Sequence, residues 1–444
     1  MRYRITAPRE LRHAVALPSS KSISNRALII HALSGADCTL LKGVSDCDDT
    51  FVMQRALNVL EASVPNTYLA AEPRETVKEE DIDIGAAGTS MRFLTALLAV
   101  TPGSHVITGS ERMRHRPIGV LVDALRQLGA DIDYVGEAGF PPLRITGRNL
   151  TGGQLDIQGD VSSQYISALL MTGPLMANGL ELHLKGHVIS RPYIHMTMEM
   201  MRQYGADVQW HGNRTVCVAP QPYTSTPYFI EGDWSAASYW FEMMALGHRT
   251  DDSVALHQLF PHSLQGDAEG RKVFSQLGVH SWFPRQKADE HTLLLRRTQA
   301  KCRRLDYDFS RIPDLAQTVV VTCCLLGIPF RFTGLQTLRI KETDRIAALC
   351  TELRKLGVRL EVGTDDTLSW DGPKRQEGGK ADYLKPQADT AIDTYNDHRM
   401  AMAFAPVALR LGSIVINHPE VVSKSYPAFW DDLRRAGFKT EVLE

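Results

Sequence analysis

The chain alternates short polar clusters with apolar runs of helical spacing, and this alternation occurs six times. The polar openings fall at Ser22, Gly88, Ser162, Asp233, Pro313 and Asn396. A second helical run ends 39 to 45 residues after each opening, at Glu61, Gly129, Gly205, Gly278, Gly357 and Gly437. The pattern therefore predicts six copies of one unit, each about 66 to 83 residues long.

The two helices of each unit differ in how much of their surface is apolar. The first is apolar nearly all round, as in residues 165–171, which predicts burial on most sides. The second is amphipathic, as in residues 120–128, and Gly129 supplies its stop. Two short strands follow, such as 130–135 and 142–146. Each unit is predicted to run helix, strand, helix and hairpin, with a further strand leading into the next unit.

A weak boundary divides the six units into three and three. Between Ala219 and Tyr228 the prolines Pro220, Pro222 and Pro227 interrupt the pattern. A repetitive chain of this kind can be a purely structural solenoid. The chemistry of the openings argues against that reading, because five of the six carry Lys or Arg, or hydroxyl and amide donors. Such donors stand where exposed backbone N–H groups already favour negative charge, so the pattern indicates anion binding.

Composition narrows the class of protein. With 444 residues, 43% of them hydrophobic, the chain is long enough for two to four domains. Lys and Arg number 49 against 51 Asp and Glu, and a net charge of −2 argues against a nucleic acid or membrane partner. Seven cysteines without a C-x-x-C motif indicate a reducing compartment and no metal site. The charged N-terminus and the short apolar run at 319–328 favour a cytoplasmic protein.

The openings of the first half offer donors for phosphate or carboxylate. Serine hydroxyls, Lys21 and Arg26 gather at one helix start, although an ordinary serine cap with solvated cations is the alternative. Gly88 lies in a small-residue turn that permits close approach of a ligand, a feature that opens many helices. Arg116 is one of three arginines before a helix whose first turn we expect Pro117 to set, and solvated arginines are the alternative.

Two further clusters in the first half suit a polyol or its phosphate. Residues 162–164, Ser-Ser-Gln, cap an apolar helix and add an amide. Ser190 and Tyr193 add a second donor set with an aromatic wall.

The second half differs in kind. Asp314 follows a proline at a helix start, where it is either a cap or a candidate general base. Residues 339–345 hold five charges, and helical spacing would place Lys341 and Arg345 on one face and pair Glu342 with Arg345. A surface salt-bridge network is the alternative. His398, Arg399 and Lys424 stand in short polar segments that are ordinary when taken singly.

Taken in order, seven segments resemble the enolpyruvyl transferases, and most closely the EPSP synthase family. They are SKSISNRAL (20–28), AGTSMRF (87–93), RPIGVLVDALRQLGA (116–130), SSQYISALLM (162–171), EGDWSAASY (231–239), KETDR (341–345) and NDHRMAM (396–402). The matches run over essentially the whole chain. Seven ordered matches at compatible spacing are far more specific than any one of them.

The resemblance implies an α/β fold, a two-domain inside-out α/β barrel of six βαβαββ repeats with three in each domain. Helix N-termini in this family are directed at an interdomain cleft that closes on the substrates. The N-terminal strand joins the C-terminal half, which implies domains of residues 1–19 with 233–444, and of residues 20–232.

The resemblance also implies the chemistry. The family transfers the enolpyruvyl group of phosphoenolpyruvate to the 5-hydroxyl of shikimate 3-phosphate and releases phosphate, by addition and elimination through a tetrahedral intermediate. The reaction belongs to the shikimate pathway of aromatic amino-acid biosynthesis and uses no metal or other cofactor. The family's habit is to be monomeric.

Roles transfer where the motifs match. The implied catalytic residues are Lys21, Asp314, Glu342 and His398, with Asp314 as the base for the hydroxyl and the division among the others left open. The implied ligands of shikimate 3-phosphate are Lys21, Ser22, Arg26, Ser162, Ser163, Gln164, Ser190, Tyr193, Asp314 and Lys341. The implied ligands of phosphoenolpyruvate are Lys21, Gly88, Arg116, Gln164, Arg345, Arg399 and Lys424.

Three positions depart from the family pattern, and two alternatives to the function stay open. Ala86 stands where Asn is common, Phe93 where Pro is usual and Thr337 where Asn is frequent. From Ala86 we expect weaker phosphoenolpyruvate binding or altered inhibitor sensitivity, and Phe93 could move its helix.

One alternative function is that of a UDP-N-acetylglucosamine enolpyruvyl transferase, which uses a loop cysteine, although this chain has none between Cys47 and Cys217. The other is a non-catalytic sugar-phosphate binder.

Overall fold

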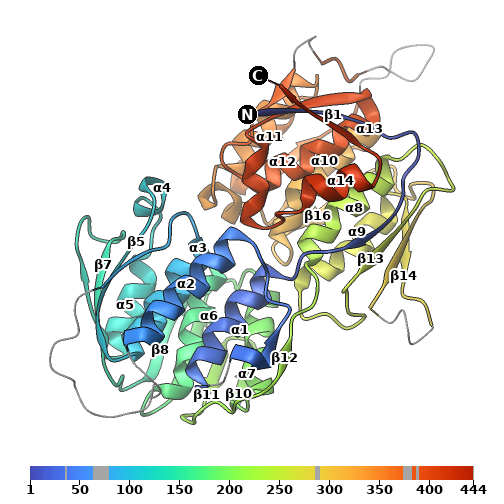
Figure 1. Cartoon of the computed structure of the whole chain (residues 1–444). Coiled ribbons are helices and arrows are strands. Elements are labelled where there is room, and N and C mark those ends of the chain that lie inside the picture. The colour runs from blue at the N-terminus through green and yellow to red at the C-terminus, as the bar shows by residue number, and fades with distance from the viewer. Residues whose placement is uncertain (36–37, 64–79, 286–290, 374–382, 387–389, 444) are drawn as a thin grey trace. The chain divides into compact units, whose positions relative to one another are not determined.

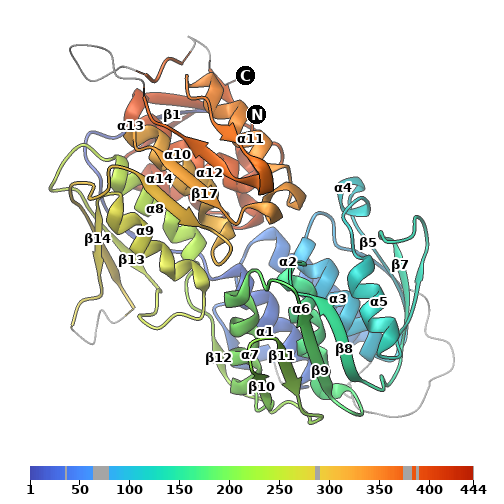
Figure 2. The same cartoon turned by 180° about the vertical axis from the view of Figure 1, so that it is seen from behind.

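The computed structural model describes residues 1–35, 38–63, 80–285, 291–373, 383–386 and 390–443. The chain forms two compact units, which Figure 1 and Figure 2 show from opposite sides. Unit 1 comprises Met1–Ser19 and Glu231–Glu444, and unit 2 comprises Ser20–Ile230. The second crossing between the units thus lies at residues 230 and 231, where the family resemblance had implied 232 and 233.

Unit 2 contains three repeats. The first has α1 (Lys21–Leu33), η1 (Cys38–Leu40), β3 (Leu41–Lys42) and α2 (Asp48–Ser63). The second has β4 (Glu80–Asp83), α3 (Gly88–Val100), β5 (Gly103–Thr108), α4 (Glu111–Arg114), α5 (Gly119–Gln127), β6 (Asp131–Tyr134) and β7 (Leu143–Gly147). The third has β8 (Gly153–Gln158), α6 (Ser163–Thr172), η2 (Gly173–Leu175), β9 (Leu180–Lys185), α7 (Arg191–Gln203), β10 (Val208–His211) and β11 (Thr215–Val218), and β12 (Tyr228–Phe229) follows.

The sheets of unit 2 follow the repeat. The second and third repeats form four-stranded sheets in the orders β4-β5-β7-β6 and β10-β11-β9-β8, and β3 of the first repeat pairs in parallel with β12. The hairpin predicted after Glu61 falls on residues 64–79, which lie outside the described residues. The first helices α1, α3 and α6 pack side by side, with the sheets outside them (Figures 1 and 2).

Unit 1 contains the other three repeats. The fourth has α8 (Trp234–Leu246), β13 (Ser253–His257), η3 (Gly266–Glu269), α9 (Gly270–Gln276), β14 (Val279–Trp282) and β15 (Leu293–Arg297). The fifth has β16 (Leu305–Asp308), η5 (Pro313–Leu315), α10 (Ala316–Leu326), β17 (Phe330–Thr333), η6 (Gln336–Ile340), α11 (Arg345–Lys355), β18 (Glu361–Val362), η7 (Thr364–Asp366) and β19 (Leu368–Trp370). The sixth has β20 (Ala391–Ile392), α12 (His398–Phe404), η8 (Ala405–Val407), α13 (Ala408–Leu411), β21 (Ser413–Asn417), η9 (Pro419–Lys424), α14 (Phe429–Arg435) and β22 (Lys439–Leu443).

Two N-terminal strands complete sheets of unit 1. β1 (Arg2–Thr6) lies between β21 and β22 and pairs antiparallel with both, so the sixth sheet has the order β20-β21-β1-β22. β2 (Arg12–Ala16) pairs in parallel with β13 in the sheet β14-β15-β13-β2. The fifth sheet has the order β16-β17-β19-β18. The fourth and sixth repeats therefore take a strand from the other end of the chain.

The helices agree with the hydrophobic pattern. Every residue of α10 from Ala316 to Leu325 is buried, as expected of a first helix that is apolar all round. Five of the six second helices end two residues before the predicted stops, and the glycines that follow them have positive φ, whereas α2 runs two residues past Glu61 to Ser63. At Gly278, for example, φ is +95° and an added Cβ would lie 2.8 Å from a backbone oxygen of Thr298, so no other residue fits without strain. Six repeats of strands and helices confirm the predicted fold class.

None of the helices in the described part of the chain has the length and apolar character that crossing a bilayer requires.

Candidate active site

In unit 2, four helices meet around the buried guanidinium of Arg26, which belongs to α1. Arg26 donates from Nε to Thr197 Oγ1 of α7 at 2.7 Å and from Nη2 to Ser167 Oγ of α6 at 3.1 Å. Its guanidinium also lies over the rings of Phe93 in α3 and Tyr193 in α7, at 5.3 and 5.9 Å. Burial lowers the pKa of Arg26 to about 10, so the side chain keeps its charge at neutral pH.

Lys21, the first residue of α1, has an acidic partner that the sequence patterns did not reveal. Its Nζ lies 3.1 Å from Asp49 Oδ2, and both side chains are largely buried. Asp49 is in the first turn of α2, and Ser90 Oγ of α3 donates to its carbonyl oxygen at 3.1 Å. An acidic residue in a first helical turn is common because of the helix dipole, so the sequence alone gave Asp49 no functional signal. Ser22 lies one residue on, and its carbonyl oxygen accepts from Arg26 Nη1 at 2.9 Å.

Gly88 and Arg116 lie in contact at the start of α3. A Cβ added at Gly88 would lie only 2.6 Å from Arg116 Nη1 and 2.8 Å from Nη2. Arg116 is 9% exposed, and its Nε has no hydrogen-bond partner among the described residues. A buried guanidinium against the positive end of a helix dipole is unfavourable until an anion joins it. This pair is therefore suited to binding an anion.

The donors predicted on α6 and α7 lie at the starts of these two helices. Ser162 caps α6 by accepting from the Gln164 backbone N–H at 3.4 Å, Ser163 is the first residue of the helix, and Gln164 Nε2 donates to Thr89 Oγ1 beside Gly88 at 3.0 Å. Ser190 caps α7 with a left-handed φ of 52°, and its carbonyl oxygen accepts from the Tyr193 N–H at 3.0 Å. The predicted residues of unit 2 thus lie at the starts of α1, α3, α6 and α7, except for Arg26, which is one turn into α1, and Arg116, which contacts Gly88 from the segment between α4 and α5.

One expectation about this part of the chain was wrong. Pro117 does not begin a helix, because α5 starts at Gly119 and Arg112 and Arg114 belong to the separate short helix α4. The carbonyl oxygen of Pro117 accepts from Arg92 Nη2 at 2.9 Å and from the Tyr165 hydroxyl at 2.5 Å. Pro117 therefore ties α3 and α6 together just after Arg116.

In unit 1, Asp314 lies at the centre of a cluster of cations. Its carboxylate is 3.2 Å from Arg345 Nη1, 3.2 Å from Arg399 Nη2 and 3.7 Å from Lys341 Nζ. The position before α10 that would cap the helix is occupied by Leu315, which makes no side-chain cap hydrogen bond. Asp314 therefore faces the predicted binding residues instead of capping the helix.

Arg345 is the most enclosed cation of this cluster. It donates from Nε to Asp397 Oδ2 at 2.7 Å and from Nη2 to Glu342 Oε2 at 2.8 Å. Burial disfavours the charge, but Asp397 and Glu342 outweigh it, and the pKa of Arg345 is raised. Because Arg345 is only 1% exposed, the alternative of a surface salt-bridge network is excluded for this residue. Asp397 was not among the predicted site residues.

The remaining predicted residues of unit 1 lie around this cluster. Lys341 precedes α11, which begins at Arg345, so the prediction that the two share a helix face was wrong, although both contact Asp314. His398 is buried at the start of α12, and its Nδ1 lies 3.9 Å from Asp397 Oδ1. Lys424 donates from Nζ to the carbonyl oxygen of Asn396 at 2.6 Å.

The three departures from the family pattern have distinct surroundings. Ala86 is exposed just before α3, whose capping residue Ala87 makes no side-chain cap hydrogen bond. Phe93 is fully buried inside a regular helix and faces Arg26. Thr337 lies in η6, and its buried Oγ1 has no hydrogen-bond partner among the residues described.

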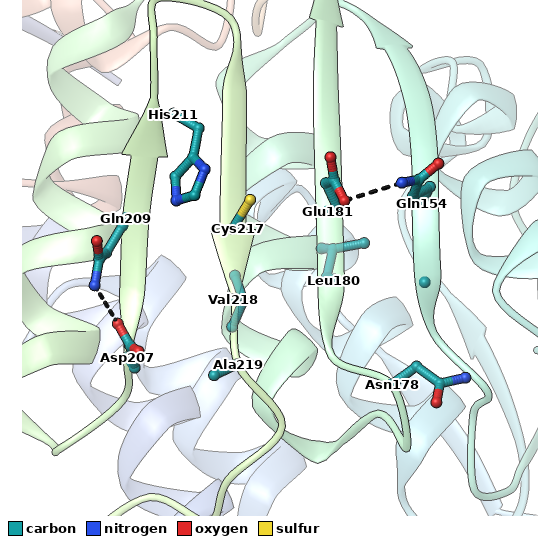
Figure 3. A pocket seen from close by; sticks show the side chains of 11 residues that line it. Gln154, Asn178, Leu180, Glu181, Asp207, Gln209, His211, Cys217, Val218 and Ala219 are labelled. Carbon is teal, nitrogen blue, oxygen red and sulfur yellow. Dashed lines mark hydrogen bonds between the residues drawn. The ribbon is translucent and has the colours of Figure 1, made fainter.

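A hollow of about 430 Å³ on the outer face of the β8–β11 sheet is a different kind of surface (Figure 3). None of the predicted residues lines it. Four of its polar side chains are paired by hydrogen bonds, Gln154 with Glu181 at 3.1 Å and Gln209 with Asp207 at 2.8 Å. Burial and the charge of Glu181 raise the pKa of the Cys217 thiol, so this cysteine is no ready nucleophile.

Across the described residues, no three His, Cys, Asp or Glu side chains form a group able to hold a metal ion.

Comparison with known proteins places the chain in a family. The model of the family described as EPSP synthase (3-phosphoshikimate 1-carboxyvinyltransferase) matches residues 5–433. A 3-phosphoshikimate 1-carboxyvinyltransferase of Bacteroides fragilis is 52% identical over 444 residues, which cover all of both chains. One of Shewanella halifaxensis is 38% identical over 428 residues, covering 94% of this chain and 95% of that protein. An EPSP synthase structure from Acinetobacter baumannii shares the fold, with a TM-score of 0.72 and 22% identity over 99% of this chain and 100% of that one. The chain belongs to the EPSP synthase family of transferases.

Proposed function

We propose that the chain transfers the enolpyruvyl group of phosphoenolpyruvate to the 5-hydroxyl of shikimate 3-phosphate and releases phosphate, as a step of the shikimate pathway. The observation that carries this proposal is the contact between Gly88 and Arg116, a buried guanidinium with an unsatisfied N–H at the start of a helix. Family membership supplies the identity of the anions, and the geometry supplies their binding groups.

Each substrate is assigned a set of binding residues. For shikimate 3-phosphate we propose Lys21, Ser22, Arg26, Ser162, Ser163, Gln164, Ser190, Tyr193, Asp314 and Lys341. For phosphoenolpyruvate we propose Lys21, Gly88, Arg116, Gln164, Arg345, Arg399 and Lys424. Arg26 also has a structural role, since its hydrogen bonds to Ser167 of α6 and Thr197 of α7 hold those helices to α1.

Asp314 is the proposed base for the hydroxyl. An entering phosphoenolpyruvate would compete with Asp314 for Arg345 and Arg399, which both contact its carboxylate. Once these cations turn to the substrate, Asp314 is less compensated and accepts a proton more readily. Substrate binding itself would thereby prepare the base.

The proposed reaction has two balanced steps. In the addition, Asp314 takes the hydroxyl proton, the hydroxyl oxygen bonds to the central carbon of phosphoenolpyruvate, and Glu342, Lys21 or His398 gives a proton to the methylene carbon. In the elimination the roles reverse: the group that gave the proton takes one back from the resulting methyl carbon, the double bond forms again, and phosphate leaves with the electron pair of the broken C–O bond. The arginines and lysines stabilise the negative charge on the phosphate and carboxylate throughout.

Three properties stay predictions. The near-zero net charge of −2 favours small metabolites over nucleic acid or anionic membranes as partners, and the odd number of cysteines without a C-x-x-C motif favours the cytoplasm. A monomer is expected only from the habit of the family.

The test is phosphate release from phosphoenolpyruvate with alternative acceptors. The purified chain is mixed with phosphoenolpyruvate and either shikimate 3-phosphate or UDP-N-acetylglucosamine. Release with the first acceptor alone supports the proposal, and release with the second alone overturns it. Release with neither, from a folded protein, favours a non-catalytic binder. Asp314→Asn should lower kcat by at least about 100-fold, because it removes the general base.

A further inference from the structure

Asp267 is a buried acid in η3 that none of the roles above uses. It is 5% exposed, and its Oδ2 accepts a hydrogen bond from the Ser235 hydroxyl. Its Oδ1 has no hydrogen-bond partner within the described parts of the chain. Ser235 in turn accepts from Arg399 Nη2 at 3.4 Å. A single hydroxyl therefore links Asp267 to a guanidinium that also contacts Asp314.

The surrounding cluster contains more acids than cations. Among the described residues, its ion pairs and charge contacts join four carboxylates, three cationic groups and one further acid at the start of α8, beside the ring of His398: Asp267, Asp314, Asp397 and Glu342, then Lys341, Arg345 and Arg399, then Asp233. Such an excess of buried and partly buried negative charge is relieved if one acid keeps a proton.

Asp267 is the acid best placed to keep that proton. Burial raises its pKa, the charges of Asp314 and Asp233 add to the rise, and Arg399 and the Ser235 hydrogen bond oppose it, leaving a pKa of about 7. These are the groups that face it from η5, from α8 and from α12.

We propose that Asp267 is a proton-linked positioning residue, which acts through Ser235 to set how far Arg399 is available to phosphoenolpyruvate. This rests on the proposed function. When Asp267 holds its proton, Arg399 offers its full charge to the substrate. When Asp267 is ionised, it shares Arg399 and fixes the Ser235 hydroxyl, and the substrate binds less tightly. The proton remains on the enzyme and is not passed to the substrate.

The test compares Asp267→Asn with the native enzyme between pH 6 and pH 8.5. The asparagine keeps the shape but cannot ionise. We expect the KM for phosphoenolpyruvate of the native enzyme to rise relative to that of the variant as pH increases, by about fivefold across the range, the lower end of usual coupling between sites. The kcat should change less than KM. The phosphate of the substrate titrates in both assays and cancels in the ratio.

A ratio of KM values that does not change with pH would overturn the inference, because a purely structural contact acts equally at every pH. Asp252→Asn is the matched control, since Asp252 is also buried in unit 1 but accepts from the backbone N–H of Leu11 at 2.8 Å. Its pH profile should follow the native one.

A second variant keeps the inference testable if Asp267→Asn does not fold. Ser235→Ala removes the hydroxyl through which Asp267 acts on Arg399, so the KM for phosphoenolpyruvate of the native enzyme should rise with pH relative to that of this variant as well. A ratio of these two KM values that does not change with pH would contradict the proposal. Absence of any turnover by the native enzyme would instead overturn the proposed function, so the two failures are distinguishable.

Discussion

Arg345 and Asp397 form a buried ion pair, with Arg345 Nε donating to Asp397 Oδ2 at 2.7 Å and with 1% and 0% of the two residues exposed. The same carboxylate caps α12 by accepting from the Arg399 N–H at 2.9 Å. One acid therefore orients two of the arginines assigned to phosphoenolpyruvate, one through its side chain and the other through its backbone.

Replacing Asp397 by Asn should destabilise unit 1 strongly. Asparagine keeps the cap but leaves a buried guanidinium with less compensating charge, and we expect the free energy of unfolding to fall by about 2 to 4 kcal/mol. Urea unfolding measures the change. Asp344→Asn is the matched control, because Asp344 also caps a helix but pairs with the half-exposed Arg339 at 2.8 Å. The control should lose less than about 1 kcal/mol, and equal losses would contradict the argument.

The Arg345–Asp397 pair also shows what the sequence could not predict. Helix starts and stops follow from short-range patterns, such as the apolar run of α10 and the positive φ of Gly278. Arg345 and Asp397 are 52 residues apart, and Lys21 and Asp49 are 28 apart, so their pairing depends on how whole repeats pack.

The residues that we did not predict from the sequence are acids at positions where acids are common. Asp49 stands in a first helical turn, Asp397 is a helix cap and Asp267 lies in a short 3₁₀ turn, all places where acids are common. The sequence did predict cationic site residues such as Lys21, because a cation at a helix start is unfavourable for the stability of the helix and therefore indicates another role. The family resemblance added roles to residues such as His398 and Lys424, which local patterns alone left unremarkable.

Gly88→Ala should weaken phosphoenolpyruvate binding. The added Cβ would lie 2.6 Å from Arg116 Nη1, so the guanidinium must move out of the place it now occupies. We expect the KM for phosphoenolpyruvate to rise at least about tenfold, because displacement of a charged donor removes more than 1.4 kcal/mol of binding. The KM for shikimate 3-phosphate should change less.

Gly119→Ala is the control for this prediction. Gly119 is also the first residue of a helix, and the nearest atom to its added Cβ is 3.4 Å away. Steady-state kinetics should show native KM values for this variant. An unchanged KM in Gly88→Ala would mean that Arg116 relaxes without loss.

Ala86→Asn should tighten phosphoenolpyruvate binding. The exposed Ala86 precedes the start of α3, where no side-chain cap is made, so an amide there adds a donor beside Gly88 and Arg116. One added hydrogen bond to a charged group should lower the KM by about three- to tenfold. Unchanged Michaelis constants would show that position 86 does not reach the substrate.

Glu242 should make the enzyme less stable as pH rises. This glutamate in α8 is fully buried in the core of unit 1, and burial raises its pKa well above the ordinary value, with only partial opposition from the Thr322 hydroxyl. The folded state therefore holds a proton that the unfolded chain releases above about pH 4 to 5. Its contribution to stability is fully present below that pH and is lost as pH increases towards the pKa of the folded state.

Glu242→Gln removes this proton linkage. Between pH 5 and pH 8, the free energy of unfolding of the native enzyme should fall more steeply than that of the variant, by up to about 1.4 kcal/mol for each pH unit. Urea unfolding at several pH values measures the two slopes, and Glu199→Gln, which changes an exposed glutamate of α7, controls for the loss of one negative charge. Parallel slopes for the native enzyme and Glu242→Gln would mean that the buried carboxyl is ionised in the folded state, and the steady-state activity of the variant then reports whether its charge matters to the neighbouring helices.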